Sequence, residues 1–151
     1  MTYIDRLIRL TQTSVGGIDR LSSIIDLVIR LWVANVFWKS GLTKIATWDS
    51  TLYLFEYEYA VPLIPTELAA ILGTGVEITM PVLLAFGLGT RFSALVLFVF
   101  NVIAVVSYPT LNDVGIKDHQ YWGLLLLVSF FHGPGALSLD HFVSKRLWQP
   151  A

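Results

Sequence analysis

Residues 68–108 read LAAILGTGVEITMPVLLAFGLGTRFSALVLFVFNVIAVVSY, and this stretch decides the fold. It contains two nearly uninterrupted apolar runs, residues 68–88 and 92–108, which are separated by a short glycine turn. With a rise of about 1.5 Å per residue, each run as a helix approaches the ~30 Å thickness of the bilayer hydrocarbon. Neither run alternates apolar and polar residues as the strands of a membrane barrel do. The stretch therefore predicts a helical hairpin that crosses a membrane twice.

Two further apolar runs flank this hairpin, at residues 24–45 and 121–137. The composition agrees with a membrane protein, because 55% of the 151 residues are apolar, 14% are charged and the mean hydropathy is +0.67. We therefore predict an all-α integral membrane bundle of four spanning helices. It forms one domain over residues 23–139, between an N-terminal segment, residues 1–22, and a tail, residues 140–151.

Three segments lie outside the runs, and the first two of them have two readings each. The connection at residues 46–66 is rich in aromatic residues, which suit the outer headgroup layer, and it could alternatively form a lid over a site between the helices. Residues 1–22 fit a short amphipathic helix on the membrane surface or a solvated leader. Residues 140–151 fit an amphipathic anchor at the inner surface, capped at its start by Ser138 or Asp140.

Basic residues are distributed unevenly between the two sides. One side has six in the terminal segments and the glycine turn: Arg6, Arg9, Arg20, Arg91, Lys145 and Arg146. The connections on the other side are mainly acidic and hold only Lys44 and Lys117. By the positive-inside rule, both termini are expected in the cytoplasm.

Several classes of function do not fit the sequence. The formal net charge of −1 gives no basic surface for nucleic acid, and the absence of cysteine excludes thiol relays and thiolate-held clusters within the chain. His119 and His132 are thirteen residues apart on one helix, about 20 Å, so they cannot ligate one haem. We expect no metal site and no cofactor held by this chain alone, although a quinone remains compatible with it.

Ionisable residues inside the predicted spans are the first candidates for function, because a charge at the bilayer centre costs about 3 kcal/mol. Arg30 lies in the first run and Glu77 near the middle of the second. We predict that they form a buried ion pair, with Asn101 of the third run supplying hydrogen bonds. Such a pair could simply fix the packing of the helices, or it could line a polar cavity for a ligand or a proton path.

A second group of candidates gathers toward the outer side: Lys39, Tyr108, His119 and Trp122. Lys39 could extend to the interface, and Tyr and Trp are typical of the interfacial belt. His119 is the candidate for binding a ligand or carrying a proton.

The order of several short motifs resembles the DoxX family of small bacterial membrane proteins. The segments are RLWVANVFWKSGLTKI, LGTGVEITMPVLLAFGLGTRFSALVL and HGPGALSLDH. The matching positions are an early Arg, a small residue followed by Lys, a mid-helix Glu, a glycine turn with Arg, and a closing GPG-x-x-S-x-D: Arg30, Gly41, Lys44, Glu77, Gly87, Gly89, Arg91, Gly133, Pro134, Gly135, Ser138 and Asp140. The resemblance implies four spans in a bacterial inner membrane.

Relatives of this family are linked to membrane subunits of thiosulfate:quinone oxidoreductases and to membrane redox complexes. The resemblance therefore implies a membrane subunit of a redox assembly that contacts quinone or a similar carrier, without deciding whether the chain itself is catalytic. A direct sulfur relay is not supported, because cysteine is absent. The alternatives are a non-enzymatic scaffold or maturation partner and, less favoured, a small transporter. The expected partners are the lipid bilayer and either another protein of a membrane complex or further copies of the chain.

Overall fold

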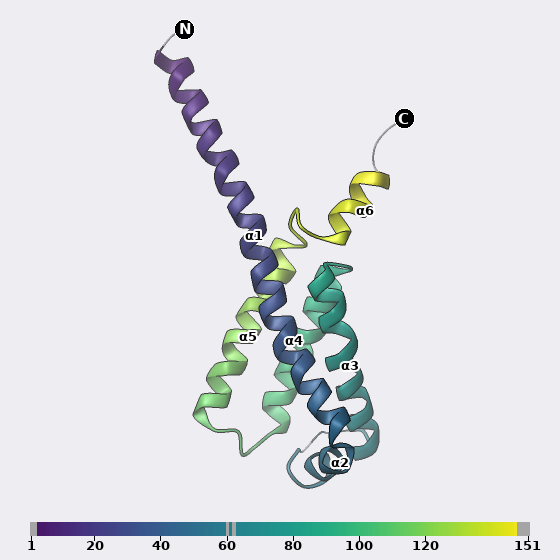
Figure 1. Ribbon diagram of the computed structural model, residues 1–151. Coiled ribbons are helices and arrows are strands. Elements are labelled where there is room, and N and C mark those ends of the chain that lie inside the picture. Colours follow the sequence, from purple (N-terminus) through teal and green to yellow (C-terminus); the bar gives the residue numbers. More distant parts are fainter. Residues whose placement is uncertain (1–2, 60, 62, 148–151) are drawn as a thin grey trace.

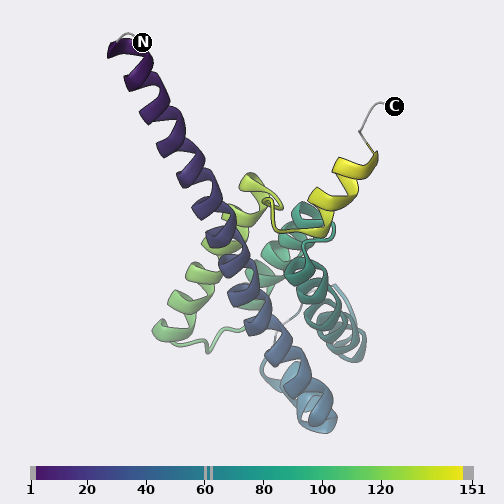
Figure 2. The same cartoon turned by 45° about the horizontal axis from the view of Figure 1, so that its top comes forward.

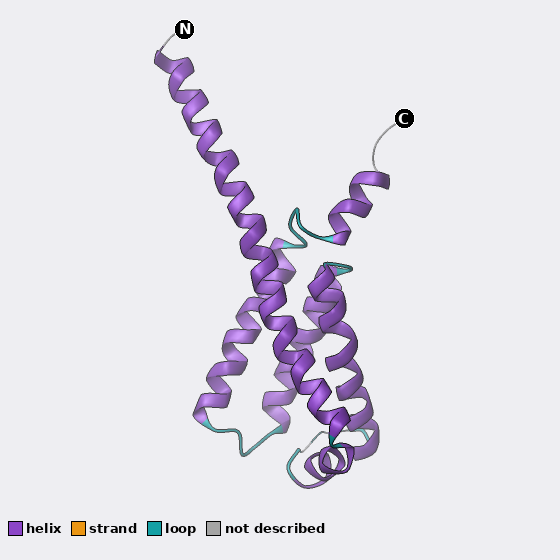
Figure 3. Ribbon diagram, in the orientation of Figure 1, coloured by secondary structure: helices purple, strands orange, loops and turns teal. Residues whose placement is uncertain are grey.

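The computed structural model describes residues 3–59, 61 and 63–147, with side chains described from Leu21 onward. Within these residues it contains helices and no strand (Figure 3). The helices in chain order are α1 (Tyr3–Ala46), α2 (Trp48–Tyr57), α3 (Thr66–Phe86), α4 (Thr90–Ser107), α5 (Asp113–His132) and α6 (Leu139–Leu147). The prediction of an all-α membrane bundle is confirmed.

Three helical segments in the described part of the chain are long and apolar enough to cross a membrane: Leu21–Ala46 of α1, Thr66–Phe86 (α3) and Thr90–Ser107 (α4). They match the first three predicted runs to within a few residues. α5 is 20 residues long, but its first turns carry Asp113, Lys117 and Asp118, so it does not belong to this apolar group. It also ends at His132, five residues before the predicted end of the fourth run. The fourth crossing stays a prediction.

α1 packs along α3 and also contacts α5, while α4 lies between α3 and α5 (Figure 1). The core holds small and medium apolar residues from all four helices: Val33, Ala34, Phe37, Leu84, Ala94, Leu97 and Leu126. α1 and α3 pack closely at Gly41, where an added Cβ would lie 2.9 Å from Ile78 Cδ1 and 3.0 Å from Glu77 Cβ. Small residues permit such close packing of helices in a membrane. Gly41 therefore sets Glu77 beside the C-terminal part of α1.

The predicted connection at residues 46–66 contains a helix that was not predicted, because Trp48–Tyr57 forms α2 at the end of the bundle opposite to the termini (Figure 1). Its apolar residues recur at helical spacing, and Trp48, Leu52, Phe55 and Tyr59 pack together against the start of α3. At the other end, the backbone of residues 3–20 continues α1 as one helix beyond the bundle instead of forming a separate surface helix (Figure 2).

The loop junction is the place where three distant segments meet at the end of the bundle that faces the termini. We use this name for Arg30, the turn at residues 87–90 and the segment at residues 133–140. The buried Arg30 donates hydrogen bonds to the carbonyl oxygens of Leu84 (3.3 Å) and Leu137. Gly87 has φ of +66°, and any Cβ there would overlap the Arg30 guanidinium and Ser138, so glycine is required.

Asp140 connects the loop junction to the start of α4. Its two carboxylate oxygens accept hydrogen bonds from the backbone N–H groups of Gly89 and Thr90, both at 2.8 Å, and its own N–H donates to Gly87 O. A carboxylate is favourable at this position because the first N–H groups of a helix have no intrahelical partner. The Ser138 hydroxyl accepts a hydrogen bond from the His141 N–H and so caps α6. This confirms Ser138 as the capping residue, one of the two that were predicted.

Candidate functional site

A cavity of about 290 Å³ lies in the half of the bundle next to α2. It is enclosed by side chains from α1 to α5 and by the segment that follows α2. Most of its lining is apolar or aromatic, with a few polar groups, which is the usual composition of a small-molecule site. The polar lining residues are Ser40, Lys44, Tyr59, Glu77, Ser107, Tyr108 and His119.

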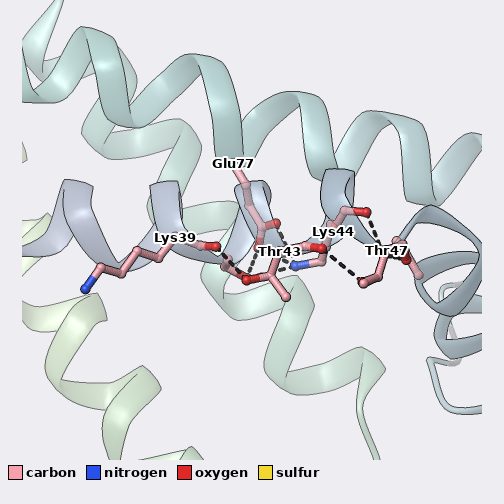
Figure 4. Close-up of polar contacts among 7 residues, drawn as sticks. Lys39, Thr43, Lys44, Thr47 and Glu77 are labelled. Atoms are coloured by element: carbon pink, nitrogen blue, oxygen red, sulfur yellow. Dashed lines mark hydrogen bonds and ion pairs between the residues drawn. The ribbon is translucent and has the colours of Figure 1, made fainter.

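Lys44 and Glu77 form an ion pair (Figure 4), and both residues line this cavity. Lys44 Nζ lies 2.6 Å from Glu77 Oε2 and 2.8 Å from Oε1, and the Ser40 hydroxyl donates to Oε1 at 3.1 Å. The Glu77 side chain is 5% exposed and that of Lys44 15%. Ser40 and Lys44 are neighbours one turn apart on α1, so a single helix face supplies both donors.

His119 of α5 also lines the cavity and is fixed by Asn101 of α4. The His119 Nδ1–H donates to Asn101 Oδ1 at 2.7 Å, and Asn101 Nδ2 donates to the His119 carbonyl at 2.9 Å. With Nδ1 engaged in this way, Nε2 has no protein partner among the described residues. The ring also packs edge-on against Trp122, with centroids 4.8 Å apart. His119 is thus held in one orientation with one nitrogen free for a ligand.

The cavity is covered on the α2 side by Phe55 and Tyr59, whose rings contact each other edge to face. Tyr59 also packs on Tyr108, and the Tyr108 hydroxyl donates to Glu58 Oε2 at 2.9 Å. Burial raises the pKa of the Tyr59 phenol, and the nearby Tyr108 and the carboxylates of Glu77 and Glu58 raise it further. Tyr59 therefore stays protonated at neutral pH and keeps its hydroxyl as a donor.

Aromatic rings make up much of the remaining wall. Phe37 packs edge to face against both Phe100 and Trp122, with centroids 6.3 and 6.1 Å apart. These rings come from α1, α4 and α5, so the cavity is bounded by flat, rigid surfaces. Such walls suit a planar ring, which stacks favourably with aromatic side chains.

Four of the seven predicted candidates line this cavity: Glu77, Tyr108, His119 and Trp122. Asn101 does not support an Arg30–Glu77 pair as predicted, because it binds His119 instead. Lys39 is exposed and its ammonium points away from Glu77 (Figure 4). It has no hydrogen-bonded side-chain partner among the described residues.

The predicted Arg30–Glu77 ion pair is wrong. Glu77 pairs with Lys44, while Arg30 belongs to the loop junction at the other end of the bundle. The physical reason is the register of α1 against α3. Gly41, not Arg30, lies beside Glu77, and the difference of eleven residues corresponds to about 16 Å along a helix.

Lys44, Ser40, Phe55 and Tyr59 are site residues that the sequence analysis did not select. Lys44 was a matching position of the family resemblance but was placed at a helix end. The signal that could have found it is the S-x-x-x-K spacing directly beside Gly41, which puts a hydroxyl and a cation on one helix face. For Phe55 and Tyr59 the signal was the helical recurrence of apolar residues from Trp48 onward.

Chemically, the cavity offers a paired acid and base, a histidine with a free nitrogen and two phenols, all within apolar walls. These groups can donate to or accept from a polar ring substituent, and Glu77, Lys44 and His119 can exchange protons. The described residues contain no group of three or more acidic or histidine side chains placed to hold a metal ion.

Comparison with known proteins gives two findings. The sequence model of the DoxX family matches residues 25–109. An uncharacterized protein of Haemophilus influenzae is 32% identical over 128 residues, which cover 79% of this chain and 83% of that protein. No solved structure matches the chain.

Proposed function

The chain belongs to the DoxX family, and we propose that its cavity holds the head of a quinone or a similar lipid-soluble carrier, so that the protein serves as a membrane subunit of a redox assembly. The observation that carries this proposal is the cavity itself. It brings the Lys44–Glu77 pair and His119 together in the lining of one aromatic-walled space inside a membrane bundle.

The size and lining of the cavity support a carrier head of one ring. About 290 Å³ is at the lower end of ligand pockets, which start near 300 Å³, so one substituted ring fits but a long amphiphile does not. Phe37 and Trp122 provide faces and edges for the ring. The Tyr59 hydroxyl can donate to a ring carbonyl oxygen, and His119 Nε2, an acceptor while Nδ1–H donates to Asn101, can accept from a hydroxyl of the reduced ring.

The proton chemistry of the cavity also fits such a carrier. A quinone takes up two electrons and two protons on reduction. The Lys44 ammonium can give one proton, and the Glu77 carboxylate and His119 Nε2 can each take up a proton from water and pass it to the ring, so both protons come ultimately from solvent. The electrons must come from another component of the assembly, since the chain has no cysteine with which to form a dithiol donor of its own. The proposal therefore requires a partner protein.

The proposed location is the bacterial inner membrane, with both described ends of the chain on the cytoplasmic side. The support is the basic side of the molecule, which includes Arg91, Lys145 and Arg146 near the loop junction. Reporter fusions after Thr90 and Lys145 should report cytoplasm, and fusions at Asp49 and Asn112 the opposite side. The reverse pattern would reject this orientation.

Binding to the purified protein tests the function directly. The protein in lipid nanodiscs should bind a methoxy-substituted benzoquinone and its reduced hydroquinone. His119→Gln should weaken binding of the hydroquinone roughly three- to tenfold, because the loss of the hydrogen bond from a ring hydroxyl to Nε2 costs about 0.5–1.5 kcal/mol. The matched control is His141→Gln on α6, an exposed histidine outside the cavity, which should bind as the wild type does.

Unfolding curves of both variants should coincide with the wild type, so that any loss of binding is a property of the site. Equal binding by the His119 and His141 variants would remove His119 from the site. Absence of binding by the wild type, alone and with its native partners, would reject the carrier function and favour the non-enzymatic scaffold.

A further inference from the structure

A second hollow, an open groove of about 470 Å³, lies between α4 and α5. Its lining is almost entirely apolar, and it includes strongly exposed residues such as Val106 (73%) and Leu124 (60%). Val106 belongs to α4, a helix that is long and apolar enough to span a membrane. An exposed apolar groove on such a helix suits contact with lipid chains.

His119 separates the groove from the cavity. It is the single residue, among those described, that lines both hollows. Its ring is half-buried and fastened to α4 through the hydrogen bond to Asn101 Oδ1, and Asn101 itself lines the groove. His119 is thus a shared wall of the two hollows, held by a pair of hydrogen bonds that a rotation of the ring would partly break.

Gly123 keeps the groove open on its side of this shared wall. A Cβ at Gly123 would lie 3.3 Å from Asn101 Nδ2 and 3.6 Å from Phe98, so a larger residue would press on the Asn101 amide. Because glycine stands there, the groove reaches the Asn101–His119 pair without obstruction. An apolar chain lying in the groove would end at the same histidine that the head group contacts from the cavity.

We infer that the groove between α4 and α5 is the lateral portal of the site, and that the apolar tail of the carrier lies in it while the head occupies the cavity. This inference rests on the proposed function. A cavity of about 290 Å³ cannot enclose a long tail, so a tailed carrier needs a continuous apolar exit, and the groove that shares His119 provides one. The ligand class is then an amphiphile with a compact polar ring and an extended chain.

The absence of cysteine allows the portal to be blocked after the protein has folded. Leu124→Cys and Val102→Cys place single thiols on the groove, and each is alkylated in the folded protein with a bulky maleimide. Val82→Cys is the matched control, because Val82 lines a different lipid-facing groove, between α1 and α3. The probes are a methoxy-substituted benzoquinone without a tail and the same head with a decyl tail.

Alkylation of the Leu124→Cys or Val102→Cys protein should weaken binding of the decyl compound at least about tenfold and leave the affinity for the tailless compound within about twofold of its unmodified value. Alkylation at Val82 should change neither. If alkylation in Leu124→Cys and Val102→Cys leaves the affinity for both probes unchanged, or lowers both affinities equally, the portal is overturned while the carrier site is left intact. Failure of the unmodified protein to bind either probe would reject the proposed function instead.

Discussion

The Lys44–Glu77 pair permits a quantitative test of how the bundle is held together. Lys44→Met leaves the Glu77 carboxylate, which is 5% exposed, with only the Ser40 hydroxyl as a donor. Stranding a buried charge in this way costs about 3–5 kcal/mol of the free energy of unfolding. Glu77→Gln should cost less, about 1–3 kcal/mol, because Lys44 is close to the end of α1 and its ammonium can extend toward the interface.

The double variant should be less destabilised than the sum of the two single changes, with a coupling of about 2–3 kcal/mol. The assay is equilibrium unfolding in mixed micelles, followed by circular dichroism. Arg30→Met combined with Glu77→Gln is the control cycle, because Arg30 bonds to Leu84 and Leu137 and not to Glu77. Its effects should add to within about 0.5 kcal/mol. A coupling below that value for Lys44 and Glu77, or a larger one for Arg30 and Glu77, would refute the assigned pairing.

Two further predictions concern packing and the loop junction. Gly41→Leu should lower the free energy of unfolding by about 1–3 kcal/mol through overpacking against Ile78 and Glu77. Gly75→Ala, with no atom within 4 Å of its added Cβ, should be neutral or stabilise the bundle by up to about 1 kcal/mol. If Gly41→Leu is not the more destabilising of the two in equilibrium unfolding, the α1–α3 contact is contradicted. Burial raises the pKa of Asp140, but hydrogen bonds from Thr90 and Gly89 and the charge of Arg30 outweigh it, so the pKa lies below its ordinary value. The stabilisation is then complete above the unfolded pKa of about 3.9 and lost as the pH falls through the folded pKa. Asp140→Ala should therefore lower the melting temperature at pH 7 and have little effect in strong acid, and an equal effect at both pH values would contradict this assignment.

The spans and the turns were predictable from sequence because each depends on local composition. The apolar runs around Glu77 and Asn101, and the glycines with positive φ at 87, 89 and 133, are visible without any knowledge of tertiary contacts. The N-terminal half of α5 was harder to predict, because Asp113, Lys117 and Asp118 make it polar although it is helical. Hydropathy indicates which segments can lie in lipid, but it does not indicate where a helix begins.

The partners of buried charges were not predictable in the same way. Arg30 and Glu77 were correctly selected as buried, but depth in the membrane does not fix which helix faces meet or at which register. That register depends on the close approach at Gly41, a contact between residues 36 positions apart. Likewise, that His119 lies beside the cavity follows from Asn101 holding α5 to α4, which the sequence does not reveal.

The loop junction also has a consequence for the order in which the protein is made. Its closing segment, residues 133–140, leaves the ribosome long after α1 and α4 have been synthesised. Until then the Arg30 guanidinium lacks the Leu137 carbonyl, and the first N–H groups of α4 lack the Asp140 carboxylate. A nascent chain that stops after His132 would contain every candidate span and the whole cavity lining, yet a buried cation would remain without one of its acceptors. Closure of this end of the bundle therefore requires residues 133–140 to have been synthesised.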